Sequence, residues 1–145
     1  STLFPYTTLF RSEGTPLSFV KSGQDIVIRM HIKTSKEIEF PILGFNIKDM
    51  LGNELVVTNT VFEKIKLPIL ESRREYVFDW KFKFPCFHPG EYPIDIALAE
   101  GTYHNHEQVH FVTDALVLKC VDDRLYQEGR GRFIIDDVRL IQQTK

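Results

Sequence analysis

The chain has 145 residues, of which 43% are hydrophobic and 26% are charged, which is the ordinary balance of one globular domain large enough to bury a core. Its formal net charge of −2 and its scattered basic residues give no electrostatic basis for a nucleic-acid partner. No apolar run approaches the roughly 20 residues of a transmembrane helix, and the N-terminus lacks the pattern of a signal peptide.

The first twelve residues, STLFPYTTLFRS, do not share the pattern of the rest of the chain. They are similar to translated adapter-derived sequence, which occurs at the ends of some assembled reads. We therefore expect residues 1–12 to be a non-native segment and residues 13–145 to be a single domain.

Alternation of apolar and polar residues predicts about eight short strands and no amphipathic helix. In chain order the predicted strands are residues 18–20, 25–34, 39–49, 54–60, 73–84, 91–100, 109–121 (as one strand or two) and 133–135. Because proline lacks an N–H donor, Pro41 predicts that the strand at residues 39–49 begins at a sheet edge or a bulge. Short connections indicate antiparallel pairing, so the fold class is an all-β sandwich or barrel.

The strand at residues 73–84 has the cleanest pattern, with an aromatic side chain at every second position from Tyr76 to Phe84. Trp80 belongs to this aromatic face, so we interpret it as a core residue rather than a platform for a sugar ring. Tyr103 and Tyr126 lie in polar surroundings and are better candidates for exposed rings. Cys120 lies in an apolar run and is expected to be a buried thiol in a reducing, cytoplasmic environment.

Motifs of the common catalytic classes are absent from the sequence. It contains no glycine-rich phosphate loop, no Walker lysine, no nucleophile elbow and no Cys-x-x-Cys pair. The pairs Asp122-Asp123 and Asp136-Asp137 are adjacent in sequence, so on a strand they would point to opposite faces and not form a glycosidase site. The chain is therefore predicted to bind rather than to catalyse. A small hydrolase built from Asp and His remains an alternative.

The densest polar cluster extends from Tyr103 to Glu107, with His110 shortly after it. If these residues lay on one strand, His104, His106 and His110 would share a face. They lack a recognised spacing of metal ligands, so we predict neither a metal nor another cofactor. A solvated loop and a ligand-contacting loop both remain open for this segment, and the candidate ligand contacts in it are Tyr103, His104, Asn105 and His106.

Outward-facing polar residues on three predicted strands form a second group of candidates. They are Arg29, His31 and Lys33 on one strand, Asn46 and Lys48 on another, and Asp79, Lys81 and Lys83 on a third. Such side chains supply donors and acceptors for sugar hydroxyls, and Arg29 and Lys48 could pair with a phosphate or carboxylate. The alternative for each is an ordinary solvated face of a sheet.

Several motifs occur in an order that resembles a known family. GFNIKDMLGNELVVTNT at Gly44–Thr60 contains an Asp-x-x-Gly turn and a Thr-Asn-Thr ending. PGEYPIDIALAEG, VHFVTDALVLKCV and a GRG segment at Gly129–Gly131 come after it. From about Leu17 to about Ile135, the chain resembles the C-terminal domain of Wzt-type ATPase subunits, which belong to ABC transporters that export O-antigen polysaccharide.

The resemblance implies an immunoglobulin-like, jelly-roll-like antiparallel β-sandwich that binds carbohydrate without catalysis. It implies recognition of the non-reducing end of an O-antigen polysaccharide, partnership with the ATPase domain and the transmembrane subunit of the transporter, and a location at the inner face of the bacterial inner membrane. The ATPase domain of a full subunit is not in this sequence. It also implies a homodimer that exchanges a C-terminal strand within 132–140, with Gly129–Gly131 as its hinge. Val138–Ile141 departs from the family pattern. A protein-interaction module is the alternative function.

Overall fold

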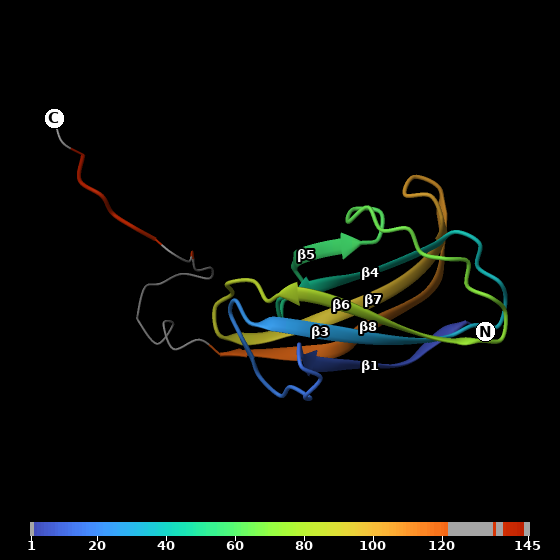
Figure 1. Ribbon diagram of the computed structural model, residues 1–145, viewed down its shortest axis with the longest axis horizontal. Coiled ribbons are helices and arrows are strands. Elements are labelled where there is room, and N and C mark those ends of the chain that lie inside the picture. Colours follow the sequence, from blue (N-terminus) through green and yellow to red (C-terminus); the bar gives the residue numbers. More distant parts are fainter. Residues whose placement is uncertain (1, 122–134, 136–137, 144–145) are drawn as a thin grey trace.

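Two β-sheets packed face to face make up the computed structural model of this protein (Figure 1). The structure describes residues 2–121, 135 and 138–143. One sheet contains β1 (Leu3–Arg11), β3 (Asp25–Lys33) and β6 (Glu75–Lys83) in the order β1-β3-β6. The other contains β2 (Val20–Lys21), β4 (Pro41–Lys48), β5 (Glu54–Asn59), β7 (Gly90–Gly101) and β8 (His106–Val121) in the order β2-β8-β7-β4-β5.

The predicted all-β sandwich is confirmed, with corrections at particular strands. Of the predicted first strand only Val20 pairs, as part of β2, which runs parallel to β8 rather than antiparallel. All other neighbouring strands in the described residues are antiparallel. Pro41 begins β4 and pairs with β7 on one side only, because the pairing of β4 with β5 begins at Gly44. The missing N–H donor of Pro41 therefore interrupts no ladder on the open side. None of the described residues belongs to a helix that could span a membrane.

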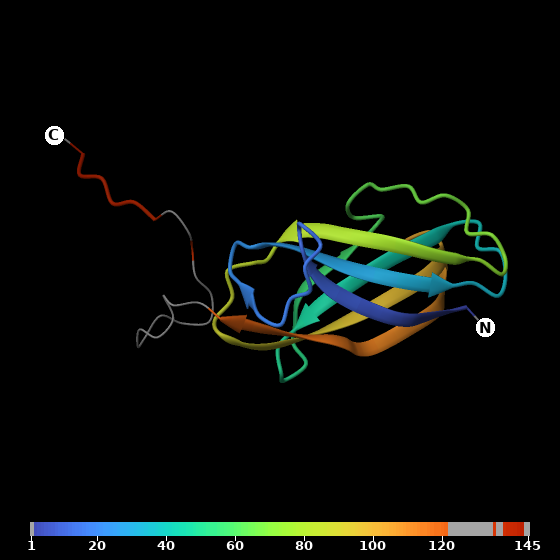
Figure 2. The same ribbon diagram turned by 60° about the horizontal axis from the view of Figure 1, so that its bottom comes forward.

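The core lies between the sheets, because alternate residues of β3, β4 and β7 point inward. Ile28 on β3 and Ile47 on β4 are fully buried, as is Ile96 on β7. Trp80 points to the same side and meets Phe45 edge-on, with ring centroids 5.3 Å apart, so its predicted place in the core is confirmed. Cys120 is buried, as predicted. Figure 2 shows the strands of the two layers crossing at an angle.

The excluded N-terminal segment contributes an edge strand. β1 pairs with β3 from Leu3 to Arg11, and the ring of Phe4 is buried. The amide of Phe4 donates a hydrogen bond to Nδ1 of His110 at 3.0 Å, which ties β1 to the other sheet. The structure therefore gives residues 3–11 a place in the sandwich, while the non-native origin of residues 1–12 stays a prediction.

The predicted strand at residues 133–135 and the hinge at Gly129–Gly131 lie outside the described residues, apart from Ile135. Ile135 and residues 138–143 belong to no strand. Their large apolar side chains are exposed, and Leu140 is 100% exposed. Tyr126, Asp122-Asp123 and Asp136-Asp137 also lie outside the described residues.

Gly44 allows β4 and β5 to approach closely. A Cβ atom at this position would lie 2.7 Å from the backbone oxygen of Thr58 and 2.9 Å from Cβ of Asn59. Both contacts are shorter than van der Waals packing permits, and neither is to the flexible end of a side chain. The close pairing of these two strands therefore requires glycine.

We expect Gly44→Ala to destabilise the protein by about 1–3 kcal/mol, the usual cost of overpacking. The direction of the change in stability identifies its cause, because replacing glycine with alanine inside an unconstrained strand stabilises the protein by about 0.5–1 kcal/mol. Urea unfolding measures the difference, with Val57→Ala on the exposed side of β5 as the control. An unchanged or raised free energy of unfolding for Gly44→Ala would show that β4 and β5 do not need this close approach.

Candidate functional site

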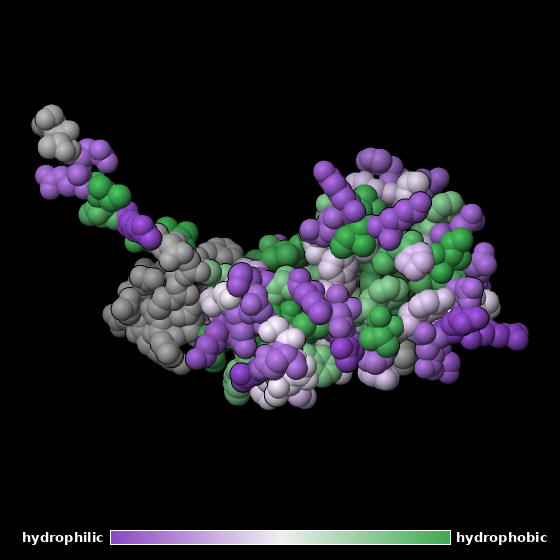
Figure 3. All heavy atoms as spheres, viewed as in Figure 1, coloured by the Kyte–Doolittle hydropathy of each residue, from purple (hydrophilic) through white to green (hydrophobic). Residues whose placement is uncertain are grey.

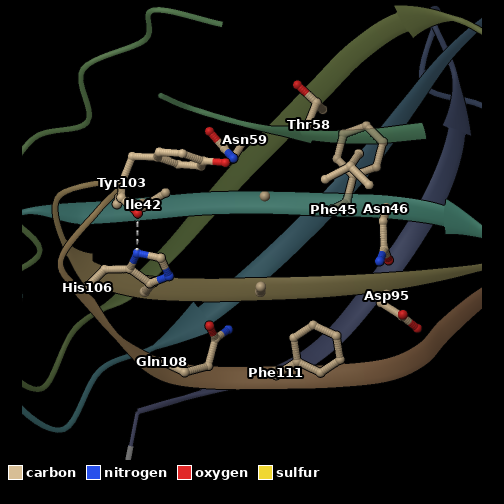
Figure 4. A pocket seen from close by; sticks show the side chains of 14 residues that line it. Ile42, Phe45, Asn46, Thr58, Asn59, Asp95, Tyr103, His106, Gln108 and Phe111 are labelled. Atoms are coloured by element: carbon tan, nitrogen blue, oxygen red, sulfur yellow. Dashed lines mark hydrogen bonds between the residues drawn. The ribbon is translucent and has the colours of Figure 1, made fainter. Parts of the chain in front are cut away.

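A pocket of about 200 Å³ lies on the outer face of the five-stranded sheet, on the side away from the core (Figure 4). Strand alternation builds it, since residues paired across β5, β4, β7 and β8 point the same way. Its lining residues are Ile42, Gly44, Phe45, Asn46, Val57, Thr58, Asn59, Asp95, Ala97, Ala99, Tyr103, His106, Gln108 and Phe111.

The floor of this pocket is made of small residues. Gly44 on β4 pairs with Ala97 on β7, and Ala99 lies next on the same face of β7. Because these residues carry at most a methyl group, the taller side chains around them enclose a depression. The pocket is thus largely apolar at its centre, with polar groups placed at its sides, which is the usual composition of a ligand site.

Aromatic rings stand at the edges of the pocket. Tyr103 is 46% exposed and Phe111 is 48% exposed. Tyr103 lies in the connection from β7 to β8, and its ring packs against Phe62 with centroids 5.1 Å apart. In Figure 4 the Tyr103 ring lies beside Asn59 and the Phe111 ring lies on β8, across the pocket floor. The predicted exposure of Tyr103 is confirmed.

An ion network closes one end of the pocket. Nζ of Lys48 lies 3.0 Å from Oδ1 of Asp95 and 3.0 Å from Oδ1 of Asp114. The two carboxylates hold the pKa of Lys48 above its usual value, Asp114 having the larger effect and Asp95 the next. Asp95 is only 5% exposed and also accepts a hydrogen bond of 2.8 Å from the amide of Asp114.

The network fixes an irregularity in β8. Between Val112 and Leu116 this strand has more residues than the facing part of β7, from Ile94 to Ile96. Asp114 lies in this bulge with a φ of 54°, a left-handed conformation that is uncommon outside glycine. The side chain of Asp95 satisfies the amide that the bulge leaves out of the ladder. Lys48 thus has two carboxylate partners within the sheet, and its pairing with a phosphate or carboxylate of a ligand stays a prediction.

The loop between β7 and β8 takes up only part of the polar cluster from Tyr103 to Glu107. It comprises residues 102–105 and contains His104 and Asn105, while His106 begins β8. The Tyr103 and His104 rings meet edge-on at 5.1 Å. Asn105 makes hydrogen bonds with Thr102 that close the turn, so its backbone has a structural role.

The three histidines do not share one face, contrary to the prediction. β8 carries one extra residue between Gln108 and His110 relative to Ala99 and Leu98 of β7. This bulge reverses the alternation, so His106 faces the pocket whereas His110 packs against Phe4. Nowhere in the described part of the chain do three or more His, Cys, Asp or Glu side chains gather closely enough to hold a metal ion.

The remaining candidates lie on the other sheet, whose outer face is the mixed hydrophilic and hydrophobic surface of Figure 3. Arg29 and Asp79 form a bidentate pair of 2.8 and 2.9 Å, and the guanidinium also lies over the Phe10 ring at 4.9 Å. His31 packs against Tyr6, with centroids 3.9 Å apart. Lys81 points outward beside them on β6. The structure thus separates Arg29, His31, Asp79 and Lys81 from the pocket.

Sequence reasoning placed Asn46, Tyr103 and His106 among the candidates, and the structure brings these three together in the pocket. It missed Asn59, Gln108 and Phe111. Alternation within β5 could have suggested Asn59, because it lies two residues from Val57. For Gln108 and Phe111 the bulge in β8 had to be known first.

The fold and the pocket together define a β-sandwich domain with a ligand-sized site on one sheet. The chain belongs to the Wzt C-terminal domain family, whose sequence model matches residues 6–133. This domain is a non-catalytic one. A comparison with curated protein sequences found no match.

Among solved structures, the chain is similar to the crystal structure of the C-terminal domain of Wzt. The TM-score is 0.85 at 12% identity, covering 97% of this chain and 84% of that chain. A second similar structure is the CARDB domain of the PF1109 protein from Pyrococcus furiosus, in complex with di-metal ions. There the TM-score is 0.47 at 13% identity, covering 81% of this chain and 90% of that chain. The first likeness shows the fold alone, and the second carries no argument about the site.

The Lys48 network should contribute more to the free energy of unfolding than an exposed ion pair does. We expect Lys48→Met to destabilise by about 1–3 kcal/mol, because it leaves Asp95 buried without its cation. Lys83→Met is the matched control, since its pair with Asp25 has a similar distance of 3.1 Å but is largely exposed. The control should change stability by less than about 1 kcal/mol in the same urea unfolding measurement. Equal losses from both variants would contradict this ranking.

The Arg29–Asp79 pair should stabilise the fold at neutral pH and lose this contribution in acid. The hydrogen bonds from Arg29 lower the pKa of Asp79 below its usual value, with the charge of Arg29 adding to the effect. A carboxylate whose pKa is lower in the folded state stabilises above the unfolded pKa of about 3.9, and this contribution is lost as the pH falls through the folded pKa.

We therefore expect Asp79→Asn to lose less free energy of unfolding than the wild type as the pH falls from about 5 to about 2. Urea midpoints measured across this range give the comparison. Identical acid dependence for the two proteins would mean that the pair does not form in solution.

Proposed function

We propose that this protein is a non-catalytic carbohydrate-binding module and that the pocket on the five-stranded sheet is its binding site. One observation carries the proposal: half-exposed rings of Tyr103 and Phe111 flank a small-residue floor that polar side chains surround. An aromatic face can pack against the C–H face of a sugar ring, while amide and imidazole groups bind its hydroxyls. Both kinds of contact are available here within one pocket.

Membership in the Wzt C-terminal domain family supports a carbohydrate-binding role in O-antigen export. The ligand that we propose is O-antigen polysaccharide, recognised at its non-reducing terminal end. A pocket of about 200 Å³ suits a single sugar residue better than a long stretch of polymer, which favours an end over an internal segment. The proposed partners are the ATPase domain and the transmembrane subunit of an ABC transporter, at the cytoplasmic side of the bacterial inner membrane.

The C-terminal residues support the proposed homodimer. Ile135, Val138, Leu140 and Ile141 are exposed and belong to no strand of this copy. Apolar side chains left uncovered in one chain are commonly covered by another, and exchange of a terminal element is an inexpensive route to a dimer. The proposed exchanged segment is residues 132–140, of which 132–134 and 136–137 lie outside the described residues.

Titration calorimetry of the full chain with O-polysaccharide from the source strain tests the function. We expect saturable binding that is lost when the non-reducing end is trimmed. Tyr103→Ala and Phe111→Ala should each weaken binding by about two- to tenfold, because each removes a ring contact.

His31→Ala and Lys81→Ala, on the outer face of the other sheet, are the matched controls and should bind normally. If the controls lose affinity while the pocket variants keep it, the sugar binds on the three-stranded sheet. Equal binding to intact and trimmed polymer would replace end recognition by recognition within the chain.

A protein-interaction module is the second candidate function, and a separate groove favours it. The groove has a volume of about 550 Å³ and lies where the segment after β5 passes the start of β4. Phe40, Ile65 and Ile69 line it and expose about half of their side-chain surface. Absence of polysaccharide binding, together with a stable dimer in solution, would shift the assignment to this function.

A further inference from the structure

Among the described residues, the pocket leaves an unusual set of polar atoms without partners, and Asn46 provides the first. Its Nδ2 donates to Oε1 of Glu54 at 3.3 Å, whereas its Oδ1 is buried and accepts no hydrogen bond from the described part of the chain. Exchanging the two amide atoms would place an oxygen against the Glu54 carboxylate, so the donor must face Glu54. An unsatisfied acceptor therefore remains on the pocket side chain that lies nearest to Asp95 across the strands.

His106 provides the second free acceptor. Its Nδ1 lies 3.0 Å from the carbonyl oxygen of Thr102 and 2.9 Å from that of Tyr103. Carbonyl oxygens only accept, so Nδ1 must carry the proton and donate to both. In the neutral ring Nε2 is then an acceptor, and Figure 4 shows the second ring nitrogen directed over the pocket floor.

Gln108 adds a third acceptor, because its Nε2 donates to the carbonyl oxygen of His110 at 3.4 Å and its Oε1 is left for a ligand. Asn59 differs from these residues. Its Oδ1 accepts from the amide of Phe62 at 2.8 Å, so its free group is the Nδ2 donor. Each amide nitrogen carries two N–H groups, so the described side-chain amides and the imidazole of the pocket offer donors as well as these three acceptors.

The charges beside the pocket disfavour an anionic ligand. None of the described residues that line it is Lys or Arg, and the neighbouring Lys48 is held by two carboxylates. Two further carboxylates bind pocket side chains directly: Glu54 contacts Asn46, and Glu63 accepts from Thr58 at 2.6 Å. These contacts place four carboxylates and one ammonium group in or beside the pocket, a balance that disfavours a further negative charge.

We propose that this pocket selects an uncharged sugar residue that presents hydroxyl or acetamido N–H donors, and that it discriminates against sugars bearing a carboxylate or phosphate. The acceptors of Asn46, His106 and Gln108 bind the donors, and the apolar floor packs against the ring or a methyl group. An anionic sugar would meet carboxylates without a free cation to neutralise it. This inference rests on the proposed function of the pocket as a carbohydrate site.

Amide chemical shifts of the 15N-labelled full chain, titrated with matched small sugars, test the proposal. The probes are methyl galactopyranoside against galacturonic acid, methyl mannopyranoside against mannose 6-phosphate, and N-acetylglucosamine against its 6-phosphate. We expect at least one neutral member to shift pocket resonances and to bind at least about tenfold more tightly than its anionic partner. Equal or tighter binding of the anionic members overturns the proposal, as does the absence of pocket shifts with every neutral probe.

Two lysine substitutions separate the pocket charge from the overall charge. Gln108→Lys adds an ammonium group inside the pocket and should raise affinity for the anionic probes by about tenfold. Val117→Lys adds the same charge on β8 outside the pocket, where Val117 is 48% exposed, and should leave the preference unchanged. If both lysines change the preference equally, the overall charge determines it and the proposal fails.

Asn46→Leu tests the unsatisfied acceptor, because leucine has a similar size and cannot accept a hydrogen bond. It should weaken binding of the neutral probe by about fivefold or more, as the loss of one hydrogen bond predicts. Unchanged affinity would overturn the role of Asn46. The polysaccharide titration is an independent readout. If the polymer binds in the pocket but anionic probes bind as tightly as neutral ones, only this inference is refuted. If the polymer does not bind, the proposed function is refuted.

Discussion

The central position of β7 is the constraint on which the rest of this structure depends. β7 is hydrogen-bonded to β4 on one side and to β8 on the other, so its two faces cannot exchange without breaking both ladders. Ile94, Ile96 and Leu98 on one face are buried in the core. On the other face the intervening residues are Asp95, Ala97 and Ala99, which form one end and the floor of the pocket. Core and site are therefore specified by the same stretch of sequence.

Much of the fold could be predicted from the sequence because period-two alternation is strong in β3, β6 and β7. Two features limited the prediction. The short β2 carries too few residues for any pattern, and its pairing with β8 depends on a contact between distant parts of the chain. β1 was not predicted as a strand because residues 1–12 were interpreted as a non-native segment, yet its backbone pairs along β3.

The candidate site was less predictable than the fold, for a physical reason that particular residues show. Outward-facing Arg29 and Lys48 look alike in the sequence, but a polar side chain serves a ligand only if its neighbours leave it free. Asp79 occupies Arg29, while Asp95 and Asp114 occupy Lys48. The opposite holds for Asn46, whose free acceptor results from the position of Glu54 across the β4–β5 pair. Such assignments need the cross-strand register, which no single strand contains.

The one-residue bulge between Gln108 and His110 has a consequence for how this family of sites can change over time. Upstream of it β8 presents even-numbered residues to the pocket, and just downstream it presents the odd-numbered Phe111. Deleting or adding one residue there would exchange whole sets of side chains between the core and the ligand face in a single event. Changes in strand length, and not only substitutions, are thus a route by which related chains could acquire differently lined pockets on an unchanged scaffold.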